Sequence, residues 1–137
     1  MTMPATPGPV NELLTTITST LLGNNTLLRM VGADGIKDRR LLRSSQPYLM
    51  VGEMETTDQS TDGDRLLESL VTLQAWSSTS RREAEVLADL LRDLLHDAAL
   101  SLTSATLVSI IHTKTVSRRE AKTALYVADV QFRAVMG

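Results

Sequence analysis

The spacing of apolar residues predicts two amphipathic helices. Over Val10–Leu22 apolar side chains return every three or four positions, which places them on one face of a helix, and Gly23 is suited to end it. The stretch Arg82–His96 shows the same spacing, with a broad apolar stripe and a charged opposite side. It opens at a capping box, because Ser80 and Glu83 are residue types that satisfy the first free N–H groups of a helix.

Alternation of apolar and polar residues predicts four strands in two hairpins. The first strand begins at Tyr48, directly after a proline, and the second covers Leu66–Trp76. The other two cover Leu107–Val116 and Ala124–Met136. Strands joined as hairpins pair antiparallel. The order helix, strand, strand, helix, strand, strand therefore predicts an α+β fold, in which an antiparallel four-stranded sheet carries two main helices on one face.

The segments outside these elements are a short arm and a basic connector. Residues 1–9 hold three of the four prolines and predict a flexible N-terminal arm before a single domain at 10–137. The connector, Thr26–Gln46, is basic at Arg39, Arg40 and Arg43, and its apolar start indicates a short helical turn. Apolar runs are too short for a membrane span, and the N-terminus lacks the pattern of a signal peptide. We therefore expect a protein kept in a cytoplasm or built into a particle assembled there.

Composition and motifs indicate no reaction chemistry. The chain has no cysteine, which excludes disulfides, thiolate zinc sites and thiol nucleophiles, and its formal net charge of −2 argues against a protein held over its surface on nucleic-acid phosphates. His96 and His112 fit no metal-binding motif, and residues 58–64 lack the ligand spacing of a calcium loop. Residues 32–35 do not have the spacing of a phosphate-binding loop. We identify no catalytic, cofactor or metal site.

Two charged connections of opposite sign are the most informative polar features. Residues 53–64 hold five acidic residues and no basic one, and predict a long solvated hairpin tip: Glu53, Glu55, Asp58, Asp62 and Asp64. Residues 117–122 predict a second tip, which is mainly basic and follows Lys114: Arg118, Arg119, Glu120 and Lys122. The two tips could neutralise each other within the fold, or they could meet head to tail between subunits, which is the contact that closes rings.

A family resemblance adds a function to this outline. Its carrying features are the first helix, the stretches Gly35–Arg39 and Gln46–Gly52, the strand Leu70–Trp76 followed by two serines, the helix Arg82–His96, and the final stretch Val127–Arg133. Taken together over about residues 10–136, they resemble the tail completion, or tail terminator, proteins of phages with long non-contractile tails and of gene transfer agents. The chain departs from that pattern at its last hairpin, where Arg118-Arg119-Glu120 stands in place of an acidic-glycine turn.

The resemblance implies a structural virion protein and no enzyme. It implies a hexameric ring that caps the tail tube, ends its polymerisation and joins the tail to the connector of the capsid, while DNA passes through the lumen without sequence-specific binding. Its partners would be the tail tube protein and the connector or stopper protein, in a particle assembled in the bacterial cytoplasm. Candidate contacts to subunits or tube are Asp58, Asp62, Asp64, Arg118, Arg119, Glu120 and Lys122. Two alternatives remain: another neck component of the same particle, and a small α+β adaptor or enzyme subunit.

Overall fold

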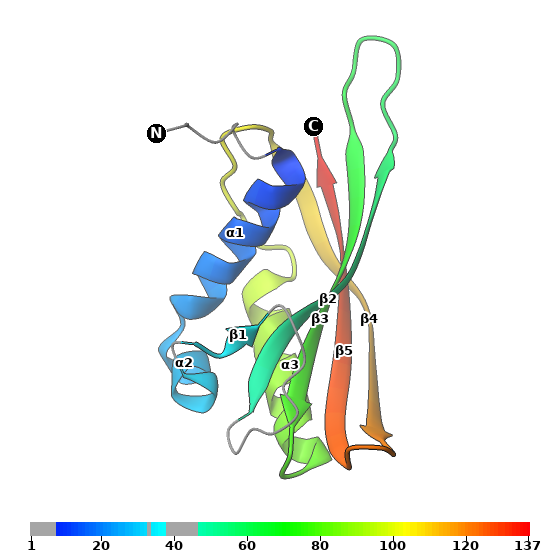
Figure 1. Cartoon of the computed structure of the whole chain (residues 1–137). Coiled ribbons are helices and arrows are strands. Elements are labelled where there is room, and N and C mark those ends of the chain that lie inside the picture. Colours follow the sequence, from blue (N-terminus) through cyan, green and yellow to red (C-terminus); the bar gives the residue numbers. More distant parts are fainter. Residues whose placement is uncertain (1–7, 33, 38–46) are drawn as a thin grey trace, which may run out of the picture.

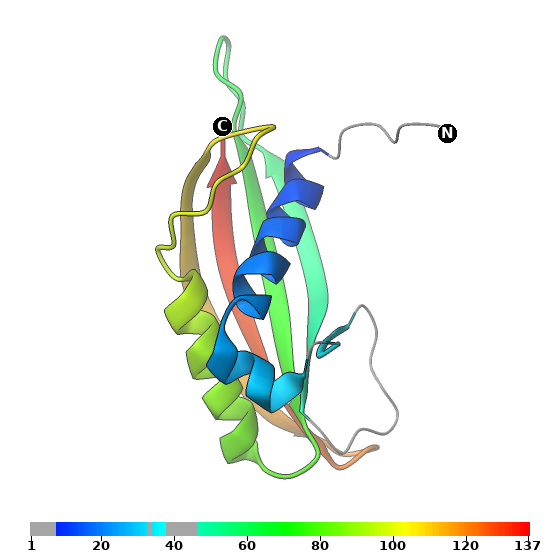
Figure 2. The same ribbon diagram turned by 90° about the vertical axis from the view of Figure 1, so that its left-hand side faces the viewer.

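The computed structural model describes residues 8–32, 34–37 and 47–137, and these form two layers, a sheet and the helices that cover one of its faces (Figures 1 and 2). The elements in chain order are α1 (Pro9–Leu22), α2 (Asn25–Val31), β1 (Ile36–Lys37), β2 (Tyr48–Asp58), β3 (Leu67–Ser77), α3 (Arg81–Leu95), β4 (Leu107–Glu120) and β5 (Leu125–Met136). The predicted α+β class is confirmed, as are both main helices and the short helical turn, which is α2.

The sheet has five strands rather than the predicted four. Its spatial order is β1-β2-β3-β5-β4, and the four long strands pair antiparallel as expected. The prediction was wrong about the edge, where β1 pairs parallel with β2 through Ile36 opposite Leu49 and Lys37 opposite Met50. A strand of two residues is too short to show alternation, so no pattern in the sequence marks it. The sheet is therefore mixed.

Local hydrogen bonds explain where the helices begin. Ser80 caps α3, because its hydroxyl oxygen accepts from the N–H of Glu83 at 3.1 Å. The carboxylate of Glu83 does not close the usual box but accepts from the hydroxyl of Ser77 at 2.7 Å, while the N–H of Ser80 donates to the same hydroxyl oxygen at 3.2 Å. Pro9 occupies the first turn of α1, where its missing N–H costs nothing. Residues 1–7 of the expected arm and the basic residues 39, 40 and 43 lie outside the described residues.

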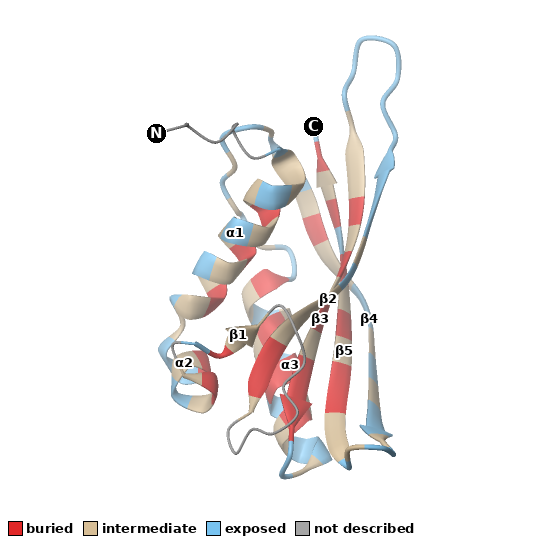
Figure 3. Cartoon of the chain, viewed as in Figure 1, coloured by how far each residue is buried: buried red, intermediate tan, exposed pale blue. Residues whose placement is uncertain are grey.

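The hydrophobic core lies between the helices and the sheet (Figure 3). Leu13 and Ile17 of α1 and Leu91 of α3 pack toward alternate residues of the strands, such as Val71 and Phe132. All five side chains are at most 2% exposed. Each buried side chain of this size contributes about 1.5–3 kcal/mol relative to an exposed one, so this single interface stabilises both layers.

A carboxylate ties α1 to the connection between α3 and β4. Glu12, in the first turn of α1, accepts from the backbone N–H groups of Thr103 and Ser104, both at 2.8 Å, and from both hydroxyls. These hydrogen bonds, led by the Thr103 hydroxyl, favour the charged form and lower the pKa of Glu12 to about 2. The long connection before β4 is thereby fixed against the first helix.

Candidate interaction surfaces

The acidic hairpin projects beyond the rest of the sheet as an arm (Figure 1). The predicted tip at 53–64 starts too early, because β2 continues pairing with β3 until Asp58 opposite Leu67. Glu53 and Glu55 therefore belong to a strand, and only Asp62 and Asp64 lie in the connection. The run of acidic residues hid this continuation, because polar residues on an exposed strand look like a loop in the sequence. We call residues 58–66 the acidic arm.

The acidic arm is held by its own hydrogen bonds. One carboxylate oxygen of Asp58 accepts from the N–H of Ser60 at 2.8 Å, and hydrogen bonds from Ser60 lower the pKa of Asp58. An isolated bridge joins Thr61 and Asp64, with Gly63 at a φ of +92°, where a side chain would be strained. Asp62 and Asp64 are exposed at this turn. The structure thus presents two carboxylates at a defined place, and Asp58 helps to shape the turn.

The basic residues lie mainly in a strand and not in a hairpin tip. The prediction of a strand ending at Val116 was wrong, because β4 pairs with β5 as far as Glu120 opposite Leu125. Only Lys122 belongs to the connection, which returns through Ala124 at a φ of +58°. The charged residues 118–120 alternate between the two faces of β4, and a paired strand tolerates them because they lie at the edge of the sheet.

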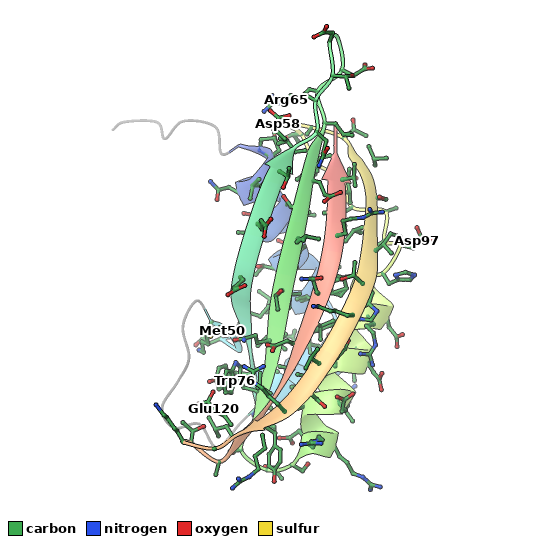
Figure 4. All side chains as sticks on the ribbon, turned by 90° about the vertical axis from the view of Figure 1, so that its right-hand side faces the viewer. Met50, Asp58, Arg65, Trp76, Asp97 and Glu120 are labelled. Carbon is green, nitrogen blue, oxygen red and sulfur yellow. The ribbon has the colours of Figure 1, made fainter. Side chains whose placement is uncertain are left out.

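The acidic arm and the basic residues lie at opposite ends of the molecule (Figures 1 and 4). Asp58 is in register with Leu67, whereas Arg118 is in register with Val127 and so with Trp76. Nine residues of β3 separate these two rows, which is about 30 Å of strand. That distance exceeds the screening length of about 8–10 Å in physiological salt. The acidic arm therefore lies too far from the basic end of β4 for the two to neutralise each other within one chain, whereas Glu53, at the start of the predicted tip, lines a hollow together with Lys114 and Arg118.

The face of the sheet opposite the helices, which Figure 4 turns toward the viewer, carries a row of side chains joined by hydrogen bonds and an ion pair across three strands. The indole N–H of Trp76 donates to the side-chain oxygen of Gln74 at 3.2 Å, and the amide of Gln74 donates to Asp129 at 2.8 Å. The second oxygen of Asp129 forms an ion pair with Arg118. The row borders a shallow hollow lined by Glu53, Thr72, Gln74, Lys114, Val116, Arg118, Asp129 and Gln131. We call this surface the open face.

A small buried apolar cluster lies on the same side of the sheet as the open face, at its basic end: Tyr48 and Trp76 are each 3% exposed, and Val127 is 0% exposed. The rings of Tyr48 and Trp76 stack at 6.2 Å, and both lie beside Val127, with Met50 and Leu125 packed against them. The sequence predicts each of these residues on a strand but does not bring them together, since they come from three strands. Only the observed order β2-β3-β5 makes them neighbours.

The two histidines also meet, and they join the end of α3 to β4. His96, which follows α3, accepts from the backbone N–H of His112 through Nδ1 at 3.0 Å. The ring of His112 packs edge-on to Phe132 at 5.8 Å, and burial is the main cause that lowers the pKa of His112. Sequence reasoning treated the two residues separately. Within the described ranges no group of three or more His, Cys, Asp or Glu residues is placed to hold a metal ion, and no helix there has the length and apolar character of a membrane span.

The family of the chain follows from comparison with known proteins. The sequence profile of the family described as "Tail completion protein gp17" matches residues 15–137. The chain belongs to this tail completion family. A search of curated proteins found no match. Among solved structures, a chain from a structure titled "Virion of native gene transfer agent (GTA) particle" has the same fold, with a TM-score of 0.83 at 21% identity, covering 93% of this chain and 97% of that one.

Family membership places this tail completion protein among structural proteins of virion tails, and confirms the resemblance drawn from the sequence. The match spans α1 from Thr15 onward, both hairpins and the chain end, so it includes the acidic arm, the basic end of β4 and the open face.

Proposed function

We propose that this tail completion protein is a tail terminator. Copies of the chain form a hexameric ring that caps the tail tube, ends its polymerisation and joins the tail to the connector of the capsid. The membership of the tail completion family and the shared fold with a chain of a gene transfer agent virion support this role. A terminator acts by binding the tail tube and the connector, so the function needs no catalytic residue or cofactor.

The observation that carries the proposal is the separation of charge along the chain. A terminator binds two different neighbours, the tube on one side and the connector on the other, and so needs two unlike surfaces. In a ring whose copies all point the same way, the acidic arm lies on one side, with Asp62 and Asp64 at its turn. Arg119 and Lys122 lie on the other side, where both side chains are exposed. Unlike charge on the two sides favours different partners and discourages stacking in the wrong orientation.

Passage of DNA sets a further condition that the chain meets. A conduit must not hold phosphates strongly, because each Lys or Arg that neutralises a phosphate adds salt-dependent affinity. The formal net charge is −2, and two basic residues of the open face lie beside acidic ones: Arg118 pairs with Asp129, and Arg133 lies 3.8 Å from Glu68. A third, Lys114, lines the same hollow as Glu53. DNA therefore passes through the proposed ring without sequence-specific binding.

Reversal of charge at one end of the molecule tests the proposal. Asp62→Lys with Asp64→Lys changes the turn of the acidic arm and leaves Gly63 and the hydrogen bonds of Asp58 in place. We expect the ring to keep its mass in native mass spectrometry, while its binding to one of the two partners falls and becomes less dependent on salt. Arg119→Glu with Lys122→Glu should affect the other partner. The matched control is Glu85→Lys with Asp93→Lys on α3, which makes the same change of charge on the helix layer.

The results separate this proposal from a different neck component. Purified tail tubes capped at one end by the wild-type chain, with a narrow length distribution, support termination. A ring that binds only the connector, and leaves tubes to grow, contradicts termination and favours the other component. If both charge-reversed pairs bind both partners like the control, the assignment of the two ends is wrong.

A further inference from the structure

Both outer edges of the sheet are partly unpaired. At one edge β1 covers β2 only at Leu49 and Met50, and no strand in the described part of the chain pairs with β2 beyond that point. At the other edge, the two residues that follow α3 hydrogen-bond to the outer side of β4. The carbonyl of Ile110 accepts from the N–H of Asp97 at 2.7 Å, and the N–H of His112 donates to His96. Between Lys114 and Arg119 no described strand pairs with β4 on the side away from β5. Each open stretch follows a bulge, after Val51 in β2 and after His112 in β4.

Exposed strand edges attract other strands, so their charges decide which partner fits. The open part of β2 carries Glu53 and Glu55, and the open part of β4 carries Lys114, Arg118 and Arg119, all exposed. Like charges across two strands destabilise their pairing, and opposite charges stabilise it. Two β2 edges therefore repel, as do two β4 edges, which disfavours closed dimers. A β2 edge facing a β4 edge brings unlike charges together.

The direction of the strands fits the same pairing. Three antiparallel steps lead from β2 through β3 and β5 to β4, so β2 and β4 run in opposite directions. When copies are related by rotation about a common axis, β4 of one copy meets β2 of the next in antiparallel orientation. This is a head-to-tail contact, which closes into a ring.

We infer that β4 of one copy, over Lys114–Arg118, pairs with β2 of the next copy, over Glu53–Thr57, and that the sheets join into one closed sheet. This inference rests on the proposed ring and names its lateral contact. In closed sheets whose strands are tilted by about 36°, the pairing register shifts by about one residue at each strand. The four long strands of one copy therefore shift the pairing of β4 with β2 of the next copy by about four residues. The shift can have either direction, and one direction places opposite charges side by side. In that register Arg118 of one copy lies opposite Glu53 of the next, and Val116 lies opposite Glu55.

The same arrangement assigns the lining of the ring. A layer of helices needs a larger circumference than a bare sheet, so α1 and α3 lie outside and the open face lies inside. The lumen is then lined by amide and hydroxyl groups, with Thr72, Gln74 and Gln131 at its centre, by the paired charges Arg118 and Asp129, and by Glu53 and Lys114, which are of opposite sign. A lining of this kind binds DNA weakly, as the proposed function requires.

Engineered disulfides test this contact, because the chain contains no cysteine of its own. Val116→Cys is combined in turn with Glu53→Cys, Glu55→Cys and Thr57→Cys. Within one chain β2 and β4 are three strand spacings apart, about 14 Å, which a disulfide cannot span. Paired strands of neighbouring copies bring the Cα atoms to about 4.5–5.5 Å, which it can. The matched control combines Val116→Cys with Val86→Cys, since these two side chains are 49% and 47% exposed.

We expect the pair with Glu55→Cys to give, in assembled rings under mild oxidation, a covalent ladder that ends at the ring size and disappears with reductant. The control pair and Val116→Cys alone should give monomers. If rings are imaged and none of the three pairs crosslinks, or if Val116→Cys alone gives dimers, the lateral contact is wrong while the proposed ring stands. If no ring forms even with tail tubes present, the proposed function fails and the lateral contact with it.

Discussion

Reversing the charge of Arg118 separates its role within the chain from its role between chains. Arg118 forms an ion pair with Asp129, and their side chains are 45% and 24% exposed. Loss of a half-exposed pair costs about 0.5–1 kcal/mol, and two like charges facing each other add a similar amount. Arg118→Glu should therefore lower the free energy of unfolding by about 1–2 kcal/mol. For a chain of this length that is a fall of about 3–10 °C in Tm, measured by thermal unfolding.

The charge swap distinguishes the two roles. Arg118→Glu with Asp129→Arg restores an ion pair within the chain but removes the carboxylate that accepts from Gln74, so Tm should lie between those of Arg118→Glu and the wild type. It also places a carboxylate opposite Glu53 of the next copy, where attraction becomes repulsion worth about 0.5–2 kcal/mol per contact, or about 2–30-fold in Kd. Native mass spectrometry at low salt should show weaker rings. Adding Glu53→Lys should restore them. Rings of wild-type strength from the swapped protein at low salt would refute the pairing of Arg118 with Glu53.

Three further predictions concern the fold. Phe132→Ala should lower the free energy of unfolding by about 3–5 kcal/mol in urea titrations, because the ring is 1% exposed. The control Val108→Ala, at a side chain that is 62% exposed, should change it by less than about 0.5 kcal/mol. Equal effects of the two substitutions would contradict the placement of the core. Ser80→Ala should cost about 1 kcal/mol by removing the cap of α3, and an unchanged urea midpoint would refute that cap. The pKa of Glu12 is lowered from 4.5 to about 2, so its contribution to stability is present above about pH 4.5 and is lost as the pH falls toward 2. Glu12→Gln should flatten the pH dependence of Tm in that window. An unchanged profile would contradict the hydrogen bonds of Glu12 with Thr103 and Ser104.

The local elements could be predicted from the sequence, because their signals lie within a few residues of each other. The apolar spacing of α1 and α3 and the cap at Ser80 are of this kind. Strand ends were harder, since β2 and β4 continue through charged residues that only their partners β3 and β5 hold in a sheet. The parallel strand at Ile36 is fixed by contact with Leu49 and leaves no local pattern.

The candidate surfaces were predictable in composition and not in arrangement. The sequence shows one acidic and one basic stretch, but their positions at opposite ends depend on the register between Asp58 and Leu67 and between Arg118 and Val127. The row from Trp76 through Gln74 and Asp129 to Arg118 joins three strands, so no sequence spacing reveals it. The open strand edges likewise depend on the strand order, which the sequence leaves undetermined.

Native mass spectrometry combined with negative-stain imaging, before and after addition of purified tail tubes, shows whether the chain forms a terminator ring. We expect a discrete hexamer, seen as a ring, and rings at one end of the tubes, whose growth then stops. A chain that stays monomeric at every concentration and salt, and leaves tube ends bare and growing, would contradict the proposed terminator ring.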